Sequence, residues 1–290
     1  MHWSTYVTVV AACRLIERWL AIRDSDLTVA VCHRCIAIDA SVHSLTKYSC
    51  ICVQVEYAIE AVKQGACAVG LVSNKYALVA SIKRQASELA SYQQKVFKID
   101  SHMGVATSGL ISDARVLAQY MRNECMNHRY VFDSPMPTER LVSKLSDKSQ
   151  HFTQKADKRP YGVGLLVAGY DPQTGPHLFQ TEPSGVYFEF KAQAIGARSQ
   201  SARTYLEKTY NSYADASLDE LVKHCLTALK GASQKKLTSR NVSVGFVGAD
   251  AEFRILEGDA IKAYVNAVTN EDDEDEAEEK VSAGRDSTII

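Results

Sequence analysis

Apolar residues recur along most of the chain with regular periods that predict helices and strands. Val55, Ile59 and Val62 fall at i, i+4 and i+7, which predicts a short amphipathic helix that stops at Gly65. Compact apolar runs of strand length follow, separated by polar residues or glycine, at 66–71, 76–80, 96–99 and 103–107. This first block is therefore predicted to be rich in β-strands.

Two helices and a second block of strands are predicted next. A helix is expected over 112–130, with Ser112 and Asp113 at its start, and a second one follows Pro137. Their apolar positions share one side of each helix: Ala114, Leu117, Met121 and Cys125 in the first, and Leu141, Val142, Leu145 and Phe152 in the second. Runs at 162–170, 177–181 and 185–190 then predict strands.

The clearest helical signal lies near the end of the chain. Ser217 and Glu220 form an S-x-x-E capping box, and Gly231 is expected to end the helix that they start. Its apolar stripe consists of Leu218, Leu221, Val222, Cys225, Leu226 and Leu229. A helix over 199–210 is predicted before it, and strands at 242–247 and 252–256 and a short helix from Asp259 are predicted after it.

The order of these elements predicts the fold class and the domains. Helices arrive in pairs between blocks of strands, without β-α-β alternation, which predicts an α+β fold and a four-layer α/β/β/α sandwich. Residues 54–268 are expected to form one domain, because no linker divides them. Residues 1–53 show no sustained period and are expected to be an atypical extension of uncertain fold. Eight acids between Glu271 and Glu279 predict a disordered acidic tail over 269–290.

Composition and motifs exclude several classes of function. The formal net charge is −1, and no apolar run approaches the roughly 20 residues of a membrane span, so neither nucleic acid nor a membrane is an expected partner. No phosphate-binding, zinc-protease or serine-hydrolase motif occurs. Cys32, Cys35, Cys50 and Cys52 match a zinc site only weakly, because the second pair is C-x-C. We expect no metal and no cofactor.

A longer motif resembles a known family, the proteasome alpha subunits. It begins with Gln54, Val55, Glu56, Tyr57 and Ala58, which with residues 60–65 closely resemble the signature helix of that family. The runs 107–110, 113–115, 159–164 and 196–199 agree with the family in order and spacing across about 54–268. The runs 199–207 and 220–224 most resemble one of the seven alpha types.

The resemblance implies a fold, a set of partners and a location. The fold is the four-layer sandwich of N-terminal-nucleophile hydrolases, and the function is that of a noncatalytic structural subunit of the alpha ring of the 20S core particle. Such a subunit contributes to ring assembly, antechamber and activator docking in ubiquitin-dependent degradation. Its partners are other alpha subunits, beta subunits and the C-terminal tails of activators, in cytoplasm and nucleus.

No catalytic residue is expected. The family's catalytic beta subunits use an N-terminal threonine, an aspartate and a lysine. By the register of the first strand, the threonine position falls on Ala66 and the aspartate position near Ile82, and only Lys95 matches. A lone lysine has no nucleophile to activate.

The resemblance instead implies a binding role for Lys95. A pocket between adjacent alpha subunits receives the C-terminal carboxylate of activator tails, and Gly65 and Leu110 match other positions that line it. An ammonium group in a partly desolvated pocket pairs well with a carboxylate. Without the resemblance, a surface lysine at the start of a strand is the simplest interpretation.

Residues 1–49 depart from the family, because they lack its tyrosine-aspartate gate element. A mispredicted or alternative first exon and a genuine extension are both open explanations. Two other functions also stay open. One is an autonomous N-terminal-nucleophile hydrolase that uses Cys67, and the other is a non-assembling isoform.

Overall fold

The computed structural model describes residues 53–268 except 86, 88, 156, 234 and 235. The chain divides into two units, Met1–Val53 and Gln54–Ile290, and the description below concerns the second. Apart from Val53, the predicted extension over 1–53 with its C-x-x-C motif lies outside the described residues, and so does the predicted acidic tail over 269–290.

The strands form two antiparallel sheets of five strands each. The first sheet has the order β10-β9-β2-β1-β8 and contains β1 (Ala68–Val72), β2 (Tyr76–Ile82), β8 (Ala192–Ile195), β9 (Val242–Gly248) and β10 (Ala251–Leu256). The second has the order β3-β4-β5-β6-β7 and contains β3 (Val96–Asp100), β4 (Met103–Gly109), β5 (Val163–Asp171), β6 (Gly175–Thr181) and β7 (Tyr187–Glu189).

Helices lie between the strands at the predicted places. They are α4 (Ile111–Phe132), α5 (Thr138–Gln154), α6 (Ser199–Thr209) with the 3₁₀ turn Tyr210–Ser212, and α7 (Leu218–Ala232). Two further helices cover 53–64 and 259–268. The prediction of an α+β fold is therefore confirmed. The four-residue strand β8 was not predicted, because its short run carries no period of its own.

Two predicted helix boundaries are wrong. Helix α4 has Leu110 as its N-cap, without a side-chain cap, so Ser112 and Asp113 already lie inside the first turn. Helix α7 continues through Gly231 to Ala232. A glycine inside a helix costs only about 1 kcal/mol, and burial of Leu229 and Ala232 on the same face offsets that cost.

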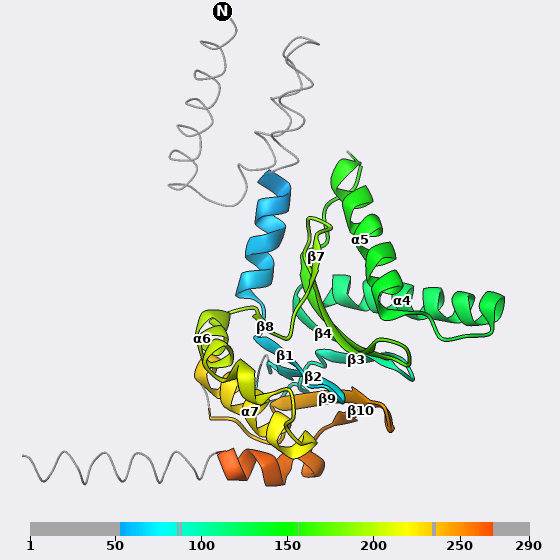
Figure 1. Cartoon of the computed structure of the whole chain (residues 1–290). Coiled ribbons are helices and arrows are strands. Elements are labelled where there is room, and N and C mark those ends of the chain that lie inside the picture. Colours follow the sequence, from blue (N-terminus) through cyan, green and yellow to red (C-terminus); the bar gives the residue numbers. More distant parts are fainter. Residues whose placement is uncertain (1–52, 86, 88, 156, 234–235, 269–290) are drawn as a thin grey trace, which may run out of the picture. The chain divides into compact units, whose positions relative to one another are not determined.

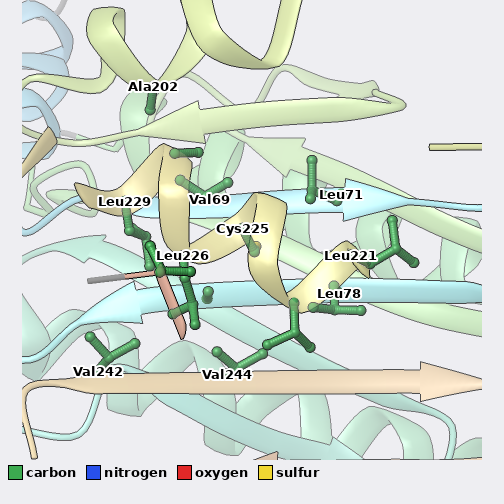
Figure 2. Close-up of a cluster of buried hydrophobic side chains, with 14 of the residues drawn as sticks. Val69, Leu71, Leu78, Ala202, Leu221, Cys225, Leu226, Leu229, Val242 and Val244 are labelled. Carbon is green, nitrogen blue, oxygen red and sulfur yellow. The ribbon is translucent and has the colours of Figure 1, made fainter. Parts of the chain in front are cut away.

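Helices α6 and α7 cover one face of the first sheet (Figure 1). The predicted capping box is present, since the Ser217 hydroxyl accepts a hydrogen bond from Glu220 N and Ser217 N donates to the Glu220 carboxylate at 2.8 Å. Figure 2 shows the buried face of α7 directed at β1, β2 and β9. The labelled side chains of this cluster are Val69, Leu71, Leu78, Ala202, Leu221, Cys225, Leu226, Leu229, Val242 and Val244.

The other two apolar clusters cover the remaining faces of the sheets. Helices α4 and α5 pack on the second sheet through a cluster that contains Leu117, Met121, Leu141, Leu145 and Val167. A third cluster lies between the two sheets and contains Ala68, Val79, Ala106, Leu166, Leu178 and Phe253. Both faces of each sheet are therefore buried. Among the described residues, we find no helix with the length and apolarity that crossing a membrane requires.

Candidate functional site

The signature motif lies on the helix over 53–64. Along it, the side chains of Gln54, Glu56 and Tyr57 are exposed, Val55 is half-buried and Ala58 is buried. Burial of Ala58 with partial burial of Val55 gives the helix one packed side, as the apolar spacing predicted. The exposed members of the motif leave a polar and aromatic surface on the opposite side.

This helix ends against the end of strand β4. Gly65 N donates to Val62 O at 3.0 Å, and the Ser108 hydroxyl donates to the same carbonyl at 3.0 Å. A Cβ atom placed on Gly65 would lie 2.2 Å from Gly109 N and 2.4 Å from the Ser108 Oγ. Only glycine therefore allows the helix to approach β4 this closely.

The substitution Gly65→Ala is expected to separate the helix end from β4, because backbone atoms of Gly109 cannot yield as a flexible side chain would. We expect a loss of about 1–3 kcal/mol in the free energy of unfolding. Faster amide hydrogen exchange over 60–66 and 107–110 would measure the local opening. Gly231→Ala is a suitable control, because a Cβ there meets nothing within 4 Å. Equal exchange in Gly65→Ala and the unchanged protein would contradict the expectation.

Lys95 immediately precedes strand β3 and is buried, with 4% of its surface exposed. Its backbone carbonyl accepts hydrogen bonds from Thr107 N at 3.0 Å and from the Thr107 hydroxyl at 3.2 Å. Burial, with a smaller effect of the Arg84 charge, lowers the pKa of Lys95 to about 8. The simplest interpretation from sequence, a surface lysine, is therefore wrong: its backbone is anchored on β4 and its side chain is withdrawn from water.

Arg84 links Lys95 to the end of the helix over 53–64. Its guanidinium donates to Gln64 O at 3.3 Å and to Gly65 O at 3.5 Å, and its charge acts on Lys95. Within the described part of the chain, neither cation forms an ion pair with a carboxylate. Arg84 was not among the predicted site residues, because no motif marked it. The one feature of the sequence that could have pointed to Arg84 is its position just after the buried strand β2.

Leu110 completes this group of residues. It follows Gly109, which packs against Gly65, and its N–H donates to Gly162 O at 2.9 Å. Its side chain is 46% exposed and lies over Gly162. The structure therefore connects all three predicted pocket residues around the end of β4.

An ion pair between the buried Asp113 and the largely exposed Arg159 fixes the chain next to Leu110. The Asp113 carboxylate accepts hydrogen bonds from both terminal nitrogens of Arg159, at 2.7 and 2.8 Å, and from Gly162 N at 3.0 Å. Burial alone would raise the pKa of Asp113. The hydrogen bonds from Arg159 and Gly162 outweigh burial and lower it. Asp113 and Arg159 both lie in runs of the sequence that resemble the family, but no pattern in the sequence indicated that they form an ion pair.

The positions relevant to hydrolase chemistry are unlike a nucleophile site. Ala66 is buried just before β1 and has no hydroxyl, and Ile82 ends β2. Cys67 is 3% exposed, and burial raises the pKa of its thiol to about 12. Because the thiolate is the reactive form, this thiol is not activated. Over the described residues, no three His, Cys, Asp or Glu side chains are grouped so as to hold a metal ion.

Comparison with known proteins places the chain in a family. The sequence profile of the proteasome subunit family matches residues 62–247. Over 222 residues, the chain is 51% identical to proteasome subunit alpha type-1 of Dictyostelium discoideum, an alignment that covers 76% of this chain and 89% of that protein. It is 45% identical over 227 residues to proteasome subunit alpha type-1 of Drosophila melanogaster, with 77% and 81% covered.

A third relative, from Schizosaccharomyces pombe, is named probable proteasome subunit alpha type-6. It is 45% identical over 215 residues, with 73% of this chain and 79% of that protein covered. The type-1 relatives confirm the predicted resemblance of the runs 199–207 and 220–224, which pointed to alpha type-1. The chain therefore belongs to the proteasome subunit family, and the relatives named above are alpha subunits.

Proposed function

We propose that this chain is a noncatalytic structural subunit of the alpha ring of the 20S proteasome. It contributes to ring assembly, to the antechamber and to activator docking in ubiquitin-dependent protein degradation, in cytoplasm and nucleus. Its partners are other alpha subunits, beta subunits and activator tails. One observation carries this proposal: the 51% identity to an alpha type-1 subunit extends over 89% of that protein.

The packing of the described residues supports the corresponding fold. Helices α6 and α7 pack on the first sheet, α4 and α5 pack on the second, and an apolar cluster lies between the sheets. We propose that these layers are the four-layer α/β/β/α sandwich of N-terminal-nucleophile hydrolases. The domain over 54–268, the extension over 1–53 and the acidic tail over 269–290 remain part of the same proposal.

Within the described residues, the lack of a hydroxyl or an activated thiol at the first strand supports a noncatalytic role. Ala66 offers no hydroxyl at the position that the resemblance assigns to the catalytic threonine. The alternative of an autonomous hydrolase needs Cys67 as a free N-terminal nucleophile, but this thiol is buried and its pKa is raised to about 12. The structure of the described residues offers no argument for that alternative.

Exposed large apolar side chains on helix α4 support assembly with other subunits. Four of them, Met126, Tyr130, Val131 and Phe132, lie toward the C-terminal end, and Val116 lies near the start of the helix. Aromatic side chains and methionine are enriched in subunit interfaces, and contiguous apolar patches on a surface often mark such contacts. We propose that the C-terminal end of α4 packs against a neighbouring proteasome subunit.

Native mass spectrometry of the tagged full chain, purified gently from cells, tests the proposed assembly. We expect the chain in a large particle whose fraction also cleaves peptides. A free monomer or small oligomer would instead favour the non-assembling isoform. The intact mass of the subunit tests the hydrolase alternative, because a processed enzyme would begin at Cys67.

The substitution Lys95→Ala is expected to weaken docking of activator tails without dissolving the ring. It removes the buried ammonium group that would pair with the terminal carboxylate, and bonds to charged groups contribute about 1.5–3 kcal/mol, or roughly ten- to hundredfold in affinity. A photo-crosslinkable tail peptide added to assembled particles measures labelling of this subunit. Lys98→Ala is the matched control, because Lys98 lies on β3, is half-exposed and pairs with Glu252. Unchanged labelling of Lys95→Ala would refute the pocket.

A further inference from the structure

Arg84 occupies a special place beside the proposed pocket. Its two hydrogen bonds engage the last carbonyl groups of the helix over 53–64, at Gln64 and Gly65. These carbonyls carry the negative end of the helix dipole and have no partner within the helix. Gly65 O also accepts from Ala197 N at 2.8 Å. Arg84 thus helps to fix this end of the helix.

The charges around Lys95 are unbalanced. On the segments that meet here, Lys83 pairs with Glu257 at 3.0 Å and Lys63 pairs with Glu60 at 3.5 Å. Among the described residues, Arg84 is therefore the charged side chain that acts on Lys95. Both side chains are positively charged. Two neighbouring cations repel each other unless an anion lies between them or one of them loses its proton.

We propose that Arg84 is the positioning residue of the carboxylate pocket: it holds the helix end beside Lys95, and its charge lowers the pH above which a tail carboxylate is released. This inference rests on the proposed activator-docking function. It concerns regulation of the same site, and the ligand is a peptide with a free C-terminal carboxylate and an apolar last residue. The apolar residue would contact the exposed Leu110.

The direction of the pH dependence follows from the sign of the charges. Below pH 8 Lys95 is protonated and attracts the carboxylate, and above pH 8 the empty pocket holds a neutral amine. A bound carboxylate favours the ammonium form, so binding above pH 8 takes up a proton. Removal of the Arg84 charge would raise the pKa of Lys95 and would move the loss of binding to higher pH.

The experiment uses assembled core particles that contain the full chain. The probe is a short N-acetylated peptide that ends in leucine with a free carboxylate and carries a benzophenone side chain beside it. Its C-terminal amide serves as the control peptide. Labelling of this subunit is measured from pH 6 to 9.5 for the unchanged chain, Arg84→Gln, Arg84→Lys and Arg122→Gln. Arg122 is the matched control, because its exposed guanidinium also binds a backbone carbonyl, that of Lys98.

Each variant has a distinct expected profile. The unchanged chain and Arg122→Gln lose carboxylate-dependent labelling with a midpoint near pH 8. Arg84→Gln moves this midpoint upward by about half a pH unit or more and lowers labelling at pH 6.5 by about two- to fivefold. Arg84→Lys retains the midpoint, because it keeps the charge, but it lowers labelling at pH 6.5 because a lysine cannot bridge both carbonyls.

The outcomes that overturn the inference differ from those that overturn the pocket. An unchanged midpoint in Arg84→Gln shows that its charge does not act on Lys95, and unchanged labelling at pH 6.5 shows that it does not position the site. If Arg84→Gln fails to enter the particle, unchanged labelling in Arg84→Lys overturns the inference. Equal labelling by the acid and amide peptides, or intact labelling in Lys95→Ala, refutes the proposed activator-docking pocket itself.

Discussion

Replacing Phe253 by alanine is expected to lower the free energy of unfolding by about 3–5 kcal/mol, the largest effect of any single substitution considered for this chain. Phe253 lies on β10, is 1% exposed and belongs to the cluster between the two sheets. Its ring covers Gly104 on β4 and Gly245 on β9, where a Cβ atom would lie 2.0 and 2.5 Å from its Cζ. Truncation would leave a cavity lined by backbone, which collapses poorly.

Urea unfolding of the purified chain, followed by circular dichroism at a fixed protein concentration, measures this loss. Phe253→Leu is the control and should cost less, about 1–2 kcal/mol, because most of the volume is kept. The combination with Gly104→Ala is a sharper test. Gly104→Ala should destabilise the chain that contains Phe253 and should be better tolerated beside Ala at 253, which gives a nonzero coupling energy. A loss below about 1 kcal/mol in Phe253→Ala would contradict the role of the ring.

The second large effect is expected from Asp113→Ala, which should cost about 3 kcal/mol. The Asp113 side chain is 8% exposed, and its removal leaves Gly162 N buried without its acceptor and Arg159 without its partner. Because Arg159 is largely exposed, water screens part of its loss, and the unpaired Gly162 N–H carries most of the cost. Asp113→Asn is the control, because its amide oxygen can still accept from Gly162 N.

The same pair gives a pH dependence with a defined sign. The pKa of Asp113 is lowered in the folded chain, so its contribution is complete above its ordinary pKa, about 4, and disappears as the pH falls through the lower folded value. The unfolding free energy of the unchanged chain should therefore approach that of Asp113→Asn as the pH is lowered from 7 to 3. A difference between the two that stays constant over this range would exclude the proposed role of the charge.

Local patterns predicted most of the elements, because their signals come from adjacent turns of the chain. Ser217 and Glu220 form a capping box by contacts within one turn, and the stripe from Leu221 to Leu229 is set by the helical period alone. Boundaries were less predictable where tertiary packing extends an element, as at Gly231. The resemblance named Lys95, Gly65 and Leu110 together, and the structure connects them, although their role in tail docking stays a prediction.

The sequence by itself therefore determined the order and type of the elements, the α+β class and the family. Tertiary structure decided which distant residues meet. It placed Arg84 on the helix end at Gly65, paired Asp113 with Arg159, and set Phe253 over Gly104 and Gly245. Periodicity reports only whether a residue faces the core, so it carries no record of which segment lies opposite. Burial of Lys95 likewise arises from segments that fold together around β4, and no local pattern encodes it.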